Sequence, residues 1–184
     1  PVQLYEYTSL LVNSYKQAAW YALGAISIMV FIHFRRLLAV VLALLPVGIG
    51  FLWLNGLMGW LGIPFNPANI MTLPLIIGIG VANGVHILNR FEEENDPAIL
   101  AKSTGKAVLV SNLTTIAGFS SLILGQHQGI QSLGYVMSIG VATCMIASLT
   151  FLPASLKLIG RWLARNNEPS AVNISTTLGR EEPR

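Results

Sequence analysis

Charged residues are scarce in this sequence. Asp, Glu, Lys and Arg make up 10% of the 184 residues, whereas an ordinary soluble domain carries about 25%. The segments from Leu37 to Asn89 and from Ala107 to Leu156 contain none of them. Such runs are too long for a buried helix of a soluble protein. Together with a mean hydropathy of +0.63, they exclude a soluble enzyme and indicate a protein that resides in lipid.

Cysteine is nearly absent as well. The single Cys144 cannot form a disulfide framework or a thiolate metal site within this chain, and its apolar surroundings favour a packing role. The three histidines, His33, His86 and His127, are too scattered for a zinc site. The sequence therefore predicts neither a metal nor a cofactor. Because it shows no nucleophile, metal cluster or pair of acids, we do not expect an enzyme.

The sequence also lacks the marks of a nucleic-acid-binding protein. Its formal net charge is +3, but the cations occur in short clusters between apolar runs and form no basic face with interleaved aromatic residues. No nucleic-acid partner is expected. The chain begins at Pro1 without a signal peptide, which favours a fragment of a larger protein.

Long apolar runs are what the sequence does contain. A membrane span needs about 20 mostly apolar residues, and five segments qualify: 17–34, 37–61, 70–89, 107–124 and 130–156. None of them alternates like a barrel strand, and backbone groups in lipid must be hydrogen-bonded internally. The predicted fold class is therefore all-α, a polytopic transmembrane helix bundle with five spans.

The cations between the spans predict the orientation, because cytoplasmic loops retain Lys and Arg. Cations follow the first, third and fifth spans, whereas the loops 62–69 and 125–129 have none. The N-terminal end is thus expected outside and the C-terminal end in the cytoplasm. Residues 1–16 are amphipathic and should lead as a helix into the first span. The polar residues 161–184 are expected to form a disordered cytoplasmic tail.

The third span is rich in glycine. Gly78, Gly80 and Gly84 follow a G-x-G-x-x-x-G spacing without a preceding strand, which does not match a dinucleotide-binding fingerprint. Gly80 and Gly84 form a pair of small residues four apart, as do Gly78 and Ala82, and such pairs predict close helix packing. Pro74 is expected to kink the same helix.

Polar residues also occur within the apolar runs. Asn83 and His86 are three apart and are expected to share roughly one face of the third span. Polar groups at membrane depth usually face the bundle interior or a water-filled pathway, so both are functional candidates. The alternative is that they only bond to neighbouring helices, and that hydroxyls of the fourth span bond to their own helix. The possible partners in that span are Ser111, Asn112, Thr114 and Thr115.

Three blocks carry a resemblance: GIGVANGVHILNRFEEE, KAVLVSNLTTIAGFSSLIL and LGYVMSIGVATCMIASLTFLPASLKL. They resemble the second membrane half of resistance-nodulation-division (RND) exporters of the MMPL type, with the hopanoid-exporter branch nearest. The resemblance covers nearly the whole chain. Each half in that family has six membrane helices and a large periplasmic domain after the first. The resemblance therefore implies that this chain holds the last five helices in a bacterial inner (cytoplasmic) membrane, and that residues 1–16 leave the periplasmic domain.

The resemblance further implies an exporter of lipids or other hydrophobic molecules that is driven by the proton-motive force. Its partners would be membrane lipids, a hydrophobic substrate, the missing N-terminal half and, in some assemblies, further copies of itself. The family pattern GIGVDxGxH has an acid where this sequence has Ala82, and no span contains Asp or Glu. A proton site would then come mainly from the missing half. The residues expected to give it hydrogen-bonding support are Asn83, His86, Ser111, Thr114 and Thr115.

Two other functions remain open on the sequence. A protein-export auxiliary of the SecD/SecF type has a similar fold, but it would be expected to keep charged relay residues in its membrane helices. A five-helix module like a sterol-sensing domain would bind a lipid between helices without transporting it. An exporter, by contrast, needs two six-helix halves and two periplasmic domains.

Overall fold

The computed structural model describes residues 2–94 and 104–166, and all regular elements in this part of the chain are helices. The elements are α1 (Val2–Phe34), α2 (Leu37–Leu61), α3 (Pro67–Ile70), α4 (Leu73–Glu94), α6 (Thr104–Ser120), the 3₁₀ turn η1 (Ser121–Leu124) and α7 (Gln128–Asn166). Within these described residues, five stretches of helix are long and apolar enough to cross a membrane. The predicted all-α bundle of five spans is therefore confirmed.

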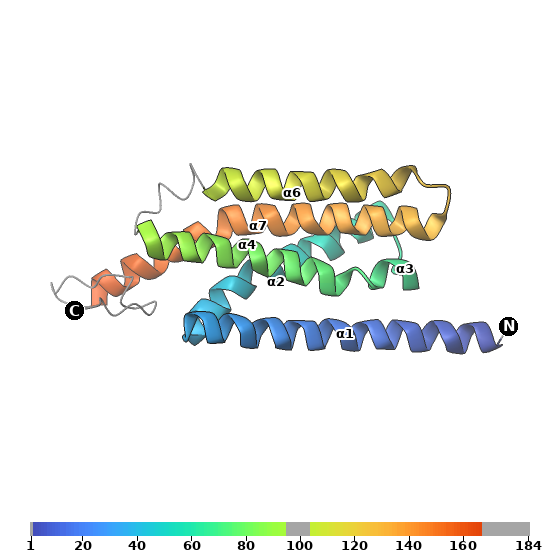
Figure 1. Ribbon diagram of the computed structural model, residues 1–184, viewed down its shortest axis with the longest axis horizontal. Coiled ribbons are helices and arrows are strands. Elements are labelled where there is room, and N and C mark those ends of the chain that lie inside the picture. Colours follow the sequence, from blue (N-terminus) through green and yellow to red (C-terminus); the bar gives the residue numbers. More distant parts are fainter. Residues whose placement is uncertain (1, 95–103, 167–184) are drawn as a thin grey trace.

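The helix α1 is continuous, so the segment 1–16 and the first span form one element rather than two. It lies along one edge of the molecule (Figure 1). Among the side chains of α1 that the structure describes, only Val30 and Phe34, near the C-terminal end, are buried. The chain then turns sharply at Arg35, whose φ of 56° lies in the left-handed region. This elbow allows α2 to begin at Leu37 and to cross the bundle obliquely.

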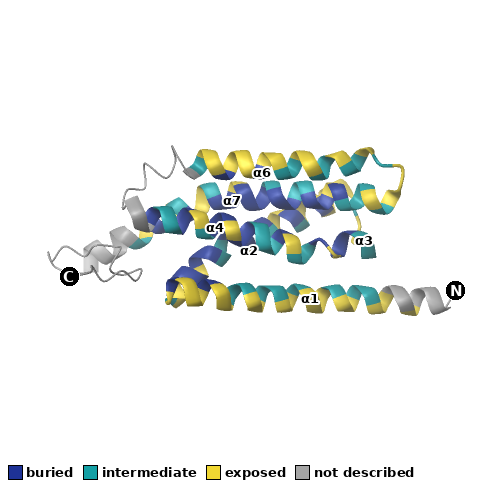
Figure 2. Ribbon diagram, in the orientation of Figure 1, coloured by how far each residue is buried: buried dark blue, intermediate teal, exposed yellow. Residues whose placement is uncertain are grey.

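The centre of the bundle is α7, which packs against α2, α4 and α6. Figure 2 shows the middle of α7 as largely buried or half-buried, whereas α1 and α6 are exposed along much of their length. The approach of α2 to α7 depends on Gly50, because a methyl group at this position would lie 2.8 Å from the Cα of Cys144. Cys144 is fully buried there, which agrees with its expected packing role.

The C-terminal end of α7 reaches further than predicted. The helix continues to Asn166, so residues 161–166, which we assigned to the tail, are helical. The remaining tail residues, 167–184, lie outside the described part of the chain.

The third span is broken near its start. The short helix α3 has a capping box in which the side chain of Asn66 accepts a hydrogen bond from the backbone N–H of Asn69, and the side chain of Asn69 accepts one from Asn66. A turn at Met71 and Thr72 follows before α4 begins. Pro74 thus lies in the first turn of α4, where a missing N–H costs nothing. The break precedes Pro74, which differs from the predicted kink within one continuous helix.

Candidate functional site

The buried polar centre of the bundle is a pair of asparagines between α4 and α6. Asn83 is 6% exposed and Asn112 is 2% exposed. The Nδ2 of Asn112 donates to the Oδ1 of Asn83 over 2.9 Å, and the Nδ2 of Asn83 donates to the Oδ1 of Asn112 over 3.2 Å. A further bond runs from the Nδ2 of Asn112 to the backbone carbonyl of Val108, over 2.7 Å.

This amide pair holds two helices together. The two amides bond to each other reciprocally, so burying them in the bundle leaves few polar atoms unsatisfied. An amide does not titrate, and therefore the pair cannot itself carry a proton. Interhelical hydrogen bonds of this kind in membranes contribute about 0.6 kcal/mol on average and up to about 1.7 kcal/mol. Asn83, predicted as a functional candidate, is placed by the structure as a link between α4 and α6.

Asn83 and His86, which were expected to share roughly one face of the third span, differ in burial. His86 is exposed, as is Ala82 one turn earlier, whereas Asn83 and Gly84 are buried. Successive residues of an α-helix are about 100° apart, so Ala82 and His86 point in nearly the same direction, and Asn83 lies roughly a quarter turn away. The boundary between the buried and exposed faces of α4 passes between Asn83 and His86.

The hydroxyl groups of α6 lie along its exposed side. Ser111 and Thr114 are exposed and Thr115 is half-buried. Thr114 donates to the backbone carbonyl of Val110 over 2.9 Å, and Thr115 donates to that of Ser111 over 3.0 Å. These are the local bonds expected for membrane Ser and Thr. We call the exposed residues Ala82, His86, Ser111 and Thr114, together with the half-buried Gly78 and Thr115, the α4–α6 outer face.

The glycines of α4 divide in the same way. A methyl group at Gly84 would lie 2.7 Å from the carbonyl oxygen of Ala43, and one at Gly80 would lie 2.9 Å from Val47 Cγ2, so both positions lie where α2 approaches closely. A methyl group at Gly78, by contrast, would meet nothing within 4 Å. The packing role predicted for all three glycines has a structural counterpart at Gly80 and Gly84 only.

A second polar cluster, which the sequence analysis did not single out, joins α3 to α7. The Nδ2 atoms of Asn66 and Asn69 each donate to the Oγ of Ser132 over 2.8 Å. Asn69 is fully buried and also donates to the carbonyl of Pro64 over 2.9 Å. The Asn-Pro step at residues 66–67 is a turn signal that could have indicated this corner. Ser132 has no comparable local signal, because its role depends on where α7 passes.

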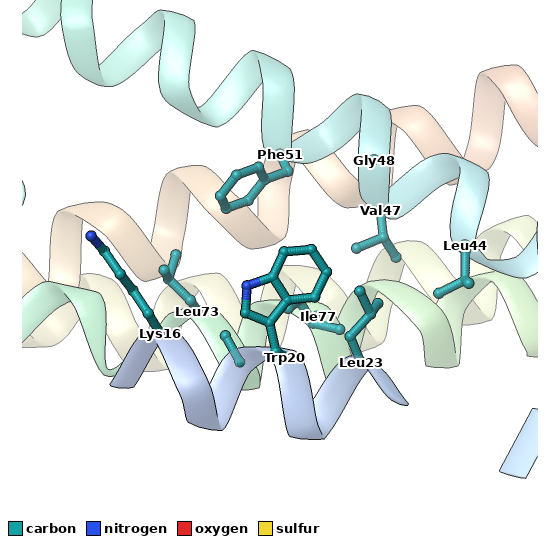
Figure 3. Close-up of a pocket in the computed structure, with 10 residues that line it drawn as sticks. Lys16, Trp20, Leu23, Leu44, Val47, Gly48, Phe51, Leu73 and Ile77 are labelled. Carbon is teal, nitrogen blue, oxygen red and sulfur yellow. The ribbon is translucent and has the colours of Figure 1, made fainter. Parts of the chain in front are cut away.

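A pocket of about 450 Å³ lies between α1, α2 and α4 (Figure 3). Its lining is apolar except for Lys16 on α1. No local motif predicts this pocket, because it results from the divergence of α1 and α2. In the described residues, no group of three or more His, Cys, Asp or Glu side chains could hold a metal ion.

The chain was compared with known proteins. Residues 10–175 match the model of the MMPL family. A putative membrane protein of Methanocaldococcus jannaschii is 38% identical over 137 residues, which is 70% of this chain and 35% of that protein. The hopanoid transporter HpnN of Rhodopseudomonas palustris is 32% identical over 154 residues, which is 84% of this chain and 18% of that protein.

A further relative is the probable trehalose monomycolate exporter MmpL3 of Mycobacterium leprae, which is 27% identical over 168 residues, or 84% of this chain and 17% of that protein. The chain thus spans about a third or less of the length of these relatives. The family is one of transporters and not of enzymes, in agreement with the sequence analysis. With the family match covering most of its length and five helices able to span a membrane, this chain belongs to the MMPL family of the RND superfamily.

Proposed function

We propose that this chain is the C-terminal membrane half of an exporter of lipids or other hydrophobic molecules that is driven by the proton-motive force. The exporting activity is suggested by the relatives, one described as a hopanoid transporter and another as a probable trehalose monomycolate exporter. The observation that carries the proposal for this chain is the α4–α6 outer face.

That face is poorly suited to lipid. It exposes the imidazole of His86 and the hydroxyl side chain of Ser111, whereas the hydroxyls of Thr114 and Thr115 bond to carbonyls of their own helix. Polar groups at membrane depth normally face other protein or a water-filled cavity. Small residues, Gly78 and Ala82, accompany them and would allow another helix to approach closely. A second membrane half that packs on this face would cover these groups and enclose a polar pathway between the halves.

The proton carrier of such a pump would come from that second half. All acidic residues of this chain lie outside the five spans, at Glu6, Glu92, Glu93, Glu94, Asp96, Glu168, Glu181 and Glu182. The position where the family pattern has an acid is Ala82, on the outer face. A carboxylate on the opposing helix would therefore face Ala82, with His86, Ser111, Thr114 and Thr115 near it and Asn83 holding α4 in place behind it.

Transport can be tested directly on the full-length protein. Purified protein in proteoliposomes should move a hydrophobic cargo between leaflets when a proton gradient is imposed, and a protonophore should stop the movement. To identify the candidate cargo, the membranes of cells that lack the gene are separated from one another. The lipids of each membrane are then extracted and analysed by mass spectrometry. Cargo movement that is unchanged by the protonophore would contradict the proposed energy source.

Orientation is a separate part of the proposal. The loops rich in cations are expected in the cytoplasm, which places Gln126 outside and Asn95 inside. Gln126 is exposed, and Asn95 lies outside the described residues. In a protein without Cys144, a cysteine at Gln126 should react with an impermeant thiol reagent in intact cells, and one at Asn95 should not. The reverse pattern would show that the bundle is inserted the other way.

A lipid-binding module without transport is the second candidate, because the pocket between α1, α2 and α4 could hold a lipid in either case. The proteoliposome experiment separates the two functions. A module of this kind would bind the cargo and leave its distribution between leaflets unchanged.

A further inference from the structure

A histidine and an asparagine join α1 to α4 near the C-terminal ends of both helices. The Nε2 of His33 lies 3.1 Å from the Oδ1 of Asn89. Because an amide oxygen can only accept a hydrogen bond, the imidazole donates through its Nε2–H. The neutral ring then carries its proton on Nε2 and an unshared electron pair on Nδ1. His33 is exposed, so a proton can reach this basic nitrogen from water.

The imidazole of His33 is held between two side chains that are themselves anchored. Besides the bond to Asn89, the ring centroid lies 4.7 Å from that of Phe34, with an interplanar angle of 87°. Phe34 is buried in the core, and Asn89 is half-buried on α4. A group that transfers protons must be held within reach of its donor and acceptor. His33 thus combines an exposed ring with a fixed position.

Asn89 lies on the side of α4 that belongs to the α4–α6 outer face. Ala82, His86 and Asn89 are separated by four and three residues, which places them within about 60° of one another around the helix. The helix rises by about 10 Å from Ala82 to Asn89. In the proposed orientation, Asn89 is at the cytoplasmic end of this path. The outer face therefore leads from the position opposite the proposed carboxylate to His33.

Histidines are the titratable groups that this path offers near neutral pH. The helix α1 packs against α2, α3 and α4, and α2 and α3 contain no charged or titratable residue. The elbow and α4 contain the remaining groups: Arg35, Arg36, His86, Arg90, Glu92, Glu93 and Glu94. The glutamates lie beyond the third span, which ends at Phe91. Within the first and third spans, only His33 and His86 change charge near neutral pH.

We propose that His33 accepts the proton that leaves the pathway between the two membrane halves and passes it to the cytoplasm. This inference rests on the proposed function. A carboxylic acid of the other half, opposite Ala82, loses its proton and becomes a carboxylate. The proton moves through water along the outer face, past His86, and binds to the Nδ1 of His33, which becomes an imidazolium. Loss of the Nδ1 proton to cytoplasmic water restores the neutral ring. Asn89 is a positioning residue, because it keeps the other proton on Nε2.

Two substitutions of nearly the same size separate proton transfer from structural support. Glutamine and glutamate at position 33 could both bond to Asn89, whose amide group presents a donor and an acceptor. Glutamate can take up a proton, whereas glutamine cannot. Because His33 is exposed, neither His33→Gln nor His33→Glu should change the melting temperature much. His127→Gln is the control, since His127 is also exposed but follows η1 at the other end of the bundle.

The experiment measures proton flux. The full-length protein is placed in liposomes made of lipid from its native membrane, with the pH-sensitive dye pyranine inside, and a potassium diffusion potential drives protons inward. His33→Gln should lower the flux about tenfold, less than the roughly 10²–10⁴-fold typical of general acid–base groups, because water near the exposed ring takes over part of the transfer. His33→Glu should stay within about threefold of the wild type, and His127→Gln should equal it.

The pH profile gives a second measurement, which a purely structural contact would not alter. With the driving force kept constant, wild-type flux should fall as the cytoplasmic side is acidified from about pH 8 to about pH 5, because protonated histidine cannot accept a proton. In His33→Glu the fall should occur at lower pH, because carboxyl groups titrate below imidazole. In His33→Gln the remaining flux should lack this step.

The results separate this inference from the proposed function. Equal flux and equal pH profiles in His33→Gln and the wild type would overturn the role of His33. Flux in His33→Glu as low as in His33→Gln would also overturn it, since His33 would then only link α1 to α4. A wild-type protein that moves no protons would refute the proposed energy source. Proton flux in the wild type that does not depend on the residue at position 33 would refute this inference alone.

Discussion

The two faces of α4 contain similar kinds of residues in very different surroundings. The inner face has Gly80, Asn83 and Gly84, which contact α2 and α6 within this chain. The outer face has Gly78, Ala82 and His86, which are exposed or half-buried. Small and polar residues thus occur on both sides of one helix. In the proposed exporter, α4 is covered on one side by its own bundle and on the other side by the second membrane half.

The largest expected effect on stability comes from a larger side chain on the inner face of α4. Gly84→Leu should destabilise the bundle by about 3 kcal/mol or more, because the new side chain would collide with the backbone of Ala43. Gly78→Leu on the outer face should leave the isolated bundle close to wild type, since the position is open. Folded yield and apparent melting temperature in detergent measure both effects.

The same two variants test whether the two faces of α4 differ in packing. If Gly84→Leu gave wild-type yield and melting temperature, α2 would not lie against α4 as described. If Gly78→Leu destabilised the chain as strongly as Gly84→Leu, the two faces would not differ. In the full-length protein, Gly78→Leu is expected to lower the yield, because the second half would then be unable to approach.

A smaller effect is expected at the amide pair. Asn83→Leu should cost about 1–2 kcal/mol, because it leaves the buried amide of Asn112 with fewer partners. The double variant Asn83→Leu/Asn112→Leu should recover part of that loss, since both polar groups are then gone. Melting temperatures of the two single variants and the double variant form a cycle that isolates the pair. An additive cycle would show that the two amides do not interact.

The sequence predicted the spans well and the faces of α4 poorly. Span existence follows from local hydropathy, which packing does not alter. Asn83 is buried on the side of α4 where it bonds to Asn112, which is 29 residues later in the chain. A pattern within one helix cannot predict a contact between residues so far apart in the sequence. Ser132 was missed for the same reason, because its two asparagine partners lie on α3. The pocket was missed because it depends on the angle between α1 and α2 rather than on any residue type.

A third effect on stability is expected at the polar contact between α3 and α7. Ser132→Ala should cost about 1 kcal/mol, because the side-chain amides of Asn66 and Asn69 both lose an acceptor. Ser111→Ala, on the exposed side of α6, is the matched control and should change stability by less than about 0.5 kcal/mol. Equal melting temperatures for the two variants would show that the contact between α3 and α7 adds no stability.

The smallest effect is expected at His86, on the outer face. His86→Ala removes an exposed side chain, so it should change the stability of the bundle by less than about 0.5 kcal/mol. In the full-length protein it should reduce transport and not abolish it. A pump needs a group that changes charge, usually a carboxylate, and the spans of this chain contain no Asp or Glu, so the carboxylate is expected in the other half. Replacing an acid on the matching central helix of the other half should abolish transport. Export in proteoliposomes, with melting temperature as the control, measures both. Complete loss of transport from His86→Ala at normal stability would make the histidine the proton carrier and would place the coupling site in this half.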